Sequence, residues 1–166
     1  PRGGRGHEPH HVGAQGQSDR RHLGRGRHFQ VQPRLHQLPK QTHVAIVGSG
    51  FSGLGAAIRL KQEGFSDLVI LERADDVGGT WRDNTYPGAA CDSPSFAYCF
   101  SFEQKTDWTR KWALQPEILA YLEHCADKYR LRPHIRFGSE IESARFDAGR
   151  SVWRLRTRAG EEHEAE

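Results

Sequence analysis

Residues 44–60, VAIVGSGFSGLGAAIRL, constrain the fold of this chain more than any other stretch. The short apolar run before the first glycine predicts a buried parallel strand. Gly48, Gly50 and Gly53 then follow in the spacing G-x-G-x-x-G. The first glycine permits a tight turn, the second lets the backbone approach a pyrophosphate, and the third lets a helix pack on the strand. The stretch predicts an α/β, Rossmann-like unit that binds a dinucleotide.

An acidic residue follows the glycine turn at the spacing that such a unit needs. A helix is expected from about Phe51 to Glu63, and a second strand, DLVILE, ends at Glu72, nineteen positions after Gly53. A carboxylate there accepts hydrogen bonds from ribose hydroxyls and repels a 2′-phosphate. We therefore expect FAD or NAD at this first site rather than NADP.

A second glycine pair indicates which of the two it is. GGTW, from Gly78 to Trp81, begins six residues after Glu72 and would let the chain pass close to a cofactor. This order of elements resembles the FAD domain of two-dinucleotide-binding flavoproteins. Disulfide reductases of that architecture carry C-x4-C directly after the pair, whereas here Cys91 and Cys99 are eight positions apart. That chemistry is disfavoured.

The first forty residues differ in composition from the rest. They hold eight of the 24 lysines and arginines but two of the 21 acidic residues, and no apolar run. We expect a disordered basic tail over 1–40, followed by a partial FAD-binding domain over 41–166. Because the chain holds no methionine, we interpret the tail as sequence from outside the native coding region and the chain as truncated.

Two specific functions for the tail, nucleic-acid binding and zinc binding, have less support from the sequence than disorder has. Its Arg-Gly clusters favour binding to nucleic acid, but Phe29 is its one aromatic ring, and residues 41–166 hold more acidic than basic side chains. HEPHH, from His7 to His11, has the letters of a zinc motif, yet Pro9 opposes the helix that the motif requires. We expect neither nucleic acid nor metal as a ligand.

Cysteine usage and hydropathy bear on the compartment. The three cysteines form no C-x-x-C pair, which favours a reducing cytoplasm. No apolar run is long enough for a membrane span or a signal peptide. We expect a cytoplasmic protein without membrane contact.

Residues 78–102, GGTWRDNTYPGAACDSPSFAYCFSF, resemble the corresponding segment of Baeyer–Villiger monooxygenases and of the wider class B flavin monooxygenases. The resemblance depends on Gly-Gly-x-Trp, Tyr86-Pro87-Gly88, the Cys91-Asp92 pair and the run to Phe102. WALQPEILAYLEHCADKYRL downstream is similar to the family's next helix, and the likeness covers residues 43 to about 158.

The resemblance implies a chemistry and a set of site residues. NADPH would reduce FAD, and a peroxyflavin formed with O₂ would insert one oxygen atom into a ketone. Residues at pyrophosphate and ribose positions are Gly48, Gly50, Ser52, Gly53 and Glu72. Residues at positions along the flavin are Gly79, Thr80, Trp81, Asp92 and Tyr98. Ile141 is at a position near the adenine, and Cys91 with Asp92 is where the nicotinamide side approaches. Asp92 is the candidate catalytic residue, since the resemblance pairs its carboxylate with an arginine over the flavin; a turn-capping role through Ser93 and Ser95 is the alternative.

Departures from the family pattern limit the substrate prediction. RDN and Ala90 stand where many ketone-oxidising members carry an aromatic run and a basic residue. An N- or S-oxygenating flavin enzyme is therefore the alternative. The NADPH glycine turn, the linker motif and the flavin arginine are expected beyond Glu166, so that the chain would be about the first third of the enzyme. Oligomeric state stays open.

Downstream of the family segment, the pattern predicts one helix and a hairpin. Pro116 favours a helix start, and the apolar residues that follow it recur at helical spacing. Members of that apolar face are Ile118, Leu119, Leu122, Ala126 and Tyr129. His124 and Cys125 are expected to be surface and packing residues. Residues 134–160 predict strands that turn at DAGR.

Overall fold

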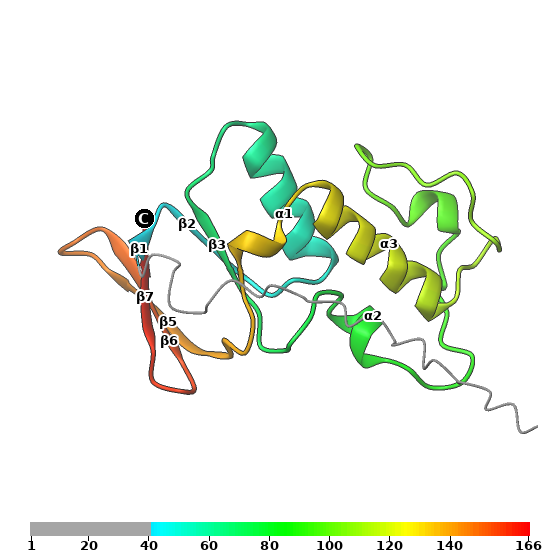
Figure 1. Ribbon diagram of the computed structural model, residues 1–166. Helices are drawn as coiled ribbons and strands as arrows, with labels where there is room; N and C mark the ends of the chain where they lie inside the picture. The colour runs from blue at the N-terminus through cyan, green and yellow to red at the C-terminus, as the bar shows by residue number, and fades with distance from the viewer. Residues whose placement is uncertain (1–40) are drawn as a thin grey trace, which may run out of the picture. The chain divides into compact units, whose positions relative to one another are not determined.

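The computed structural model describes residues 41–166. The expectations for residues 1–40, which are the disordered tail, its interpretation as non-native sequence, the nucleic-acid interpretation and the zinc interpretation, fall outside that range. Within it, a three-stranded parallel sheet and a four-stranded sheet accompany two long helices (Figure 1). The α/β, Rossmann-like prediction is confirmed.

The parallel sheet has the order β2-β3-β4, with β2 (Val44–Val47), β3 (Leu68–Leu71) and β4 (Ile135–Arg136). Helix α1 (Phe51–Gln62) connects β2 to β3, and α3 (Gln115–Lys128) precedes β4. All four residues of β3 are buried. A continuous apolar run is what a strand covered on both faces requires.

The two faces of β3 contact different layers. Leu68 and Ile70 belong to a core cluster with buried residues of α1 and α3. Val69 and Leu71 point to the opposite face, where Leu155 of the second sheet packs against them. This alternation along one strand places the helices on one side of the parallel sheet and the second sheet on the other.

Helix α3 agrees with its predicted face. Pro116 lies at its start, and Ile118, Leu122 and Ala126 are fully buried. Cys125 is also buried, and His124 is exposed, as expected. The helix therefore contributes core packing along one side.

The second sheet has the order β1-β7-β6-β5. Its strands are β1 (Gln41–Thr42), β7 (Glu162–Ala165), β6 (Val152–Thr157) and β5 (Ile141–Asp147). The predicted hairpin is confirmed: β5 and β6 pair antiparallel, and Oδ1 of Asp147 accepts hydrogen bonds from the backbone N–H groups of Gly149 and Arg150 at 3.1 and 3.2 Å. An aspartate bonded to the backbone after it favours such a turn.

Three features differ from expectation. Strand β2 was predicted to be buried, but its residues are half-buried and Val47 is 59% exposed. The reason is that, among residues 41–166, β2 pairs with β3 along one edge and has no strand on the other. The short helices were not predicted: α2 (Thr80–Asp83), η1 (Ser95–Ala97) and η2 (Arg132–His134). Nor were β1 and β7, whose sequences lack an alternating apolar pattern.

Candidate functional site

The glycine turn between β2 and α1 has the geometry that its spacing predicts. Gly48 has a φ of +89°, and its N–H donates to the carbonyl of Leu71 at 2.8 Å. Gly50 is the N-cap of α1. A Cβ on Gly53 would lie 1.9 Å from the carbonyl oxygen of Gly48, so helix and turn approach too closely for any side chain there. The first N–H groups of α1, which lack partners within a helix, follow this turn.

The second glycine pair packs directly on the first turn. The N–H of Gly78 donates to the carbonyl of Ser49 at 3.0 Å. Gly79 has a φ of +52°, and a Cβ there would be 3.0 Å from Cα of Gly50. The sequence suggested that this pair gives a cofactor room; the structure adds that it joins the two turns backbone to backbone.

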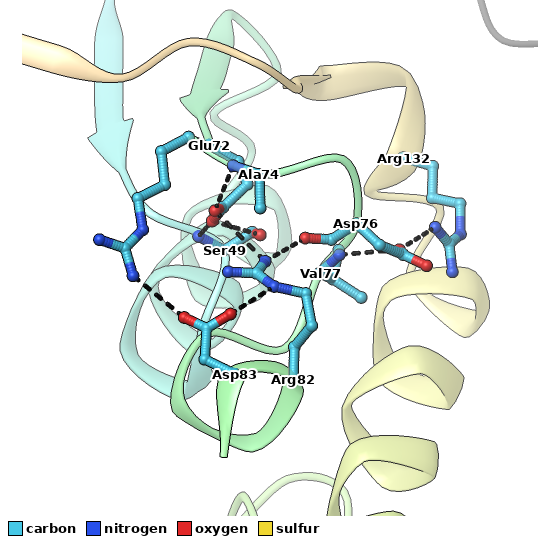
Figure 2. A network of polar contacts seen from close by, with 9 residues as sticks. Ser49, Glu72, Ala74, Asp76, Val77, Arg82, Asp83 and Arg132 are labelled. Atoms are coloured by element: carbon cyan, nitrogen blue, oxygen red, sulfur yellow. Dashed lines mark hydrogen bonds and ion pairs between the residues drawn. The ribbon is translucent and has the colours of Figure 1, made fainter. Parts of the chain in front are cut away.

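Glu72 follows β3 directly, and its carboxylate accepts four hydrogen bonds although the residue is 3% exposed. Oε2 accepts from the backbone N–H and from the hydroxyl of Ser49, both at 2.7 Å. Oε1 accepts from the N–H of Ala74 at 2.9 Å and from Nη1 of Arg82 at 3.3 Å (Figure 2). Burial by itself raises the pKa of Glu72, but the bonds from Ala74 and Ser49 and the charge of Arg82 outweigh it, and the pKa is lowered.

Charges alternate outward from Glu72 across the short helix α2. Nε of Arg82 donates to Oδ1 of Asp83 at 2.9 Å, and its Nη1 also donates to the carbonyl of Asp76. Oδ2 of Asp83 accepts from Nη2 of Arg73 at 3.0 Å. Figure 2 shows Arg82 between the two carboxylates of Glu72 and Asp83. The network therefore joins the end of β3 to the segment after the second glycine pair.

A cleft of about 420 Å³ opens at this junction. Six predicted site residues line it: Gly48, Gly50, Glu72, Gly79, Thr80 and Ile141. Its lining combines bare backbone at the start of a helix, an ionised carboxylate and an apolar side chain. Such a set is suited to a diphosphate, a ribose and a base, respectively.

Other predicted residues form a second group beside the cleft. Nε1 of Trp81 donates to the hydroxyl of Tyr98 at 3.1 Å, and both rings pack on a cluster that contains Cys91. Cys91 is 6% exposed, whereas Asp92 and Ser52 are exposed. Gly53 serves helix packing, as described above. These residues do not line the cleft that holds Glu72.

The capping role for Asp92 finds no hydrogen bond to support it among residues 41–166. The hydroxyl of Ser95 donates instead to the carbonyls of Arg110 and Lys111, both at 2.9 Å. The Asp92 carboxylate contacts the Cys91 thiol, with 4.0 Å between Sγ and Oδ1. Its exposed carboxylate is thus open to a partner.

Sequence reasoning missed three residues of the network around Glu72: Ser49, Arg82 and Asp83. Ser49 is the unspecified position between two glycines, yet it supplies two bonds to Glu72. Arg82 and Asp83 were noted as departures from the family pattern, without a role. Their signal was present: a basic and an acidic residue directly after GGTW, where an aromatic run is common.

The lowered pKa of Glu72 predicts how stability depends on pH. The unfolded chain takes up a proton on Glu72 near the ordinary glutamate pKa of 4.5, and the folded chain does so at a lower pH. This stabilisation is therefore complete above about pH 4.5 and is lost as the pH falls through the folded-state pKa. Glu72→Gln should lower the free energy of unfolding at pH 7 by about 2 kcal/mol, because charged acceptors make the stronger hydrogen bonds.

Urea unfolding at pH 7 and at several lower pH values checks this expectation. The difference in unfolding free energy between wild type and Glu72→Gln should shrink below pH 4.5. Glu63→Gln, at an exposed position at the far end of α1, should unfold nearly as wild type does. A gap between wild type and Glu72→Gln that does not depend on pH would contradict an ionised Glu72 as its source.

No helix among the described residues 41–166 is long and apolar enough to cross a membrane. The family model described as an NAD(P)-binding Rossmann-like domain matches residues 46–113. A Baeyer–Villiger monooxygenase of Streptomyces coelicolor is 52% identical over 124 residues, which cover 75% of this chain and 24% of that protein. The phenazine N-monooxygenase PhzNO1 of Lysobacter antibioticus is 38% identical over 120 residues, or 70% of this chain and 22% of that protein.

Solved structures give the same result. The oxidized steroid monooxygenase bound to NADP is 43% identical with a TM-score of 0.71, and the match covers 75% of this chain and 25% of that one. OTEMO in complex with FAD and NADP is 30% identical with a TM-score of 0.69, over 75% and 24%. The matched part of the chain thus spans about a quarter of the length of these relatives. With half of its residues identical across three quarters of its length to a protein of that kind, the chain belongs to the Baeyer–Villiger monooxygenase family.

Proposed function

We propose that the cleft holds the ADP half of FAD, and that the full-length protein is an FAD- and NADPH-dependent monooxygenase that transfers one oxygen atom of O₂ to a ketone. The observation that carries this proposal is the meeting of both glycine turns with the buried, ionised Glu72 in one cleft. Membership of the Baeyer–Villiger monooxygenase family and the cofactors named for OTEMO support it.

The packing of the chain does not require a glycine at position 50, whereas a ligand that approaches the backbone would. A Cβ on Gly50 would lie 3.6 Å from its nearest neighbour, Cα of Gly79, which is an ordinary contact. The chain itself therefore tolerates a methyl group there. Because Gly50 lines the cleft, the bare backbone is best explained by a group that must approach it closely, such as a diphosphate.

In this proposal the residues divide by the part of FAD that they hold. Gly48, Gly50 and the start of α1 with Ser52 take the diphosphate, Glu72 takes the ribose, and Ile141 lies against the adenine. The second group of residues lies along the flavin, and Gly79 and Thr80 lie between the adenine end and the flavin end of FAD. Members of the second group are Trp81, Cys91, Asp92 and Tyr98. FAD supplies the oxygen-activating chemistry, and these side chains bind and orient it.

Oxygenation of nitrogen is the second candidate function, and one observation favours it. The phenazine N-monooxygenase of Lysobacter antibioticus matches 70% of this chain. The segment that this chain matches therefore occurs both in Baeyer–Villiger monooxygenases and in an enzyme named for the oxygenation of nitrogen. We prefer a ketone as the substrate because the segment YPGAACDSPS resembles the corresponding segment of the ketone-oxidising members.

Product analysis on the full-length gene product tests the proposed function. It should purify with bound FAD, oxidise NADPH in the presence of a ketone, and convert cyclic or linear ketones to lactones or esters that mass spectrometry detects. N-oxides from tertiary amines or phenazines, without any ester, would favour the second candidate. A protein that neither retains nor binds FAD would contradict the assignment of the cleft.

A further inference from the structure

The Glu72 carboxylate has no acceptor position left for a ligand. A carboxylate offers about four lone-pair positions to donors. Glu72 already accepts from two donors on Oε2 and two on Oε1, at 2.7 to 3.3 Å. A ribose hydroxyl can therefore bind Glu72 only if one of these donors leaves.

The four donors differ in how readily they can leave. Two are backbone N–H groups, of Ser49 and Ala74, which are held by the turn and by the chain after β3. The Ser49 hydroxyl lies close, at 2.7 Å. Arg82 makes the longest contact, 3.3 Å, and donates from a flexible side chain that reaches in from α2.

Arg82 also has other partners that would keep its charge compensated. Its Nε donates to Asp83 at 2.9 Å, and Nη1 reaches the carbonyl of Asp76. Neither contact requires Glu72. Both Arg82 and Glu72 line the cleft, so a ligand there meets them together.

We propose that Arg82 occupies the acceptor position on Oε1 of Glu72 that a ribose hydroxyl takes when a dinucleotide binds. This inference rests on the proposed function of the cleft. Arg82 then keeps a buried carboxylate paired while no ligand is present, which avoids the cost of an uncompensated charge. Arg82 and the ribose compete, and Arg82 lowers the preference of the site for ribose hydroxyls.

The guanidinium also attracts phosphates, and that effect must be separated from competition. Arg73 provides the matched control, because it lines the same cleft and donates to the same Asp83 side chain at 3.0 Å, but it is not among the donors to Glu72. ADP and 2′,3′-dideoxy-ADP carry identical phosphates and differ in the ribose hydroxyls. The ratio of their dissociation constants therefore cancels the phosphate effect and reports on Glu72.

Isothermal titration of the 166-residue chain with both nucleotides tests the proposal. Arg82→Met and Arg82→Gln should each raise the preference for ADP over dideoxy-ADP by about threefold or more, the worth of one released hydrogen bond. Arg73→Met should weaken both nucleotides equally and leave the ratio unchanged. A ratio that stays constant or falls in both Arg82 variants would overturn the proposal.

A second measurement uses the stability of the empty chain. Arg82→Gln should melt at a lower temperature than wild type without ligand, and saturating ADP should narrow that difference, because the ribose replaces the lost donor. An unchanged difference contradicts the proposal. Should the wild-type chain show no preference for ADP over dideoxy-ADP, the assignment of Glu72 to ribose fails first, and the proposed function of the cleft fails with it.

Discussion

Gly53→Ala should destabilise the domain severely, by about 3 kcal/mol or more, since overpacking a rigid contact forces the backbone to move. The added Cβ would lie 1.9 Å from the carbonyl oxygen of Gly48 and 3.0 Å from its carbonyl carbon. Both neighbours are backbone atoms of the turn itself, so no side chain can rotate away. With a stability of 5–15 kcal/mol typical of a folded protein, such a loss removes a large share.

Gly50→Ala should behave in the opposite way, although it lies three positions earlier in the same motif. Its Cβ would meet Cα of Gly79 at 3.6 Å, and its φ of −80° suits alanine. The free energy of unfolding should therefore change by about 1 kcal/mol or less, the size of an N-cap effect. Affinity for ADP should fall by about tenfold or more, because the methyl group blocks the approach of the diphosphate to the backbone.

Denaturant unfolding and nucleotide titration of the two variants, side by side with wild type, separate fold from function. Gly53→Ala should unfold at a lower denaturant concentration than wild type. Gly50→Ala should unfold nearly as wild type does but bind ADP more weakly. If Gly50→Ala binds ADP as wild type does, the diphosphate lies elsewhere. If Gly53→Ala is as stable as wild type, the close approach of helix and turn is not a constraint.

Local sequence patterns predicted the elements that depend on neighbours in the chain. The turn at Gly48, the helix α1 and the buried strand β3 all follow from spacing and hydrophobicity within about thirty residues. Helix α3 is predicted for the same reason. What these elements share is that packing and propensity agree along one continuous segment.

Elements that depend on distant partners could not be predicted in this way. Strand β7, with the sequence EHEA, exists because β6 and β1 pair with it on either side. The exposure of Val47 likewise depends on which strands flank β2. Cross-strand pairing between remote segments leaves little signal in a short polar sequence.

The site shows the same division between local and distant information. Glycine spacing and the acid after β3 located the cleft, because they act through backbone geometry. The bond from Arg82 to Glu72 joins side chains ten positions apart across two turns. Its existence depends on the path of the chain through the glycine pair, and a sequence pattern does not specify that path.

Asp92 is the residue that we propose for a role in the reaction rather than in holding FAD. The backbone on both sides of Asp92 is anchored to the segment that leads into α3: the N–H of Cys91 donates to the carbonyl of Ala113 at 3.0 Å, and the N–H of Ser95 donates to the carbonyl of Lys111 at 2.7 Å. The loop is therefore fixed against this segment, while the carboxylate stays exposed. The family resemblance pairs this carboxylate with an arginine that lies over the flavin.

In the full-length gene product, Asp92→Ala should retain FAD but lose about tenfold or more, some 1.4 kcal/mol, in flavin reduction by NADPH or in product formation. The physical reason is that an ion pair which places a cation near developing negative charge acts on the transition state more than on cofactor binding. Stopped-flow absorbance of the flavin-loaded enzyme measures both steps. Asp92→Asn keeps the shape without the charge and should lose nearly as much, because the charge holds the arginine. Rates equal to wild type in both variants would leave Asp92 as a surface residue of an anchored loop.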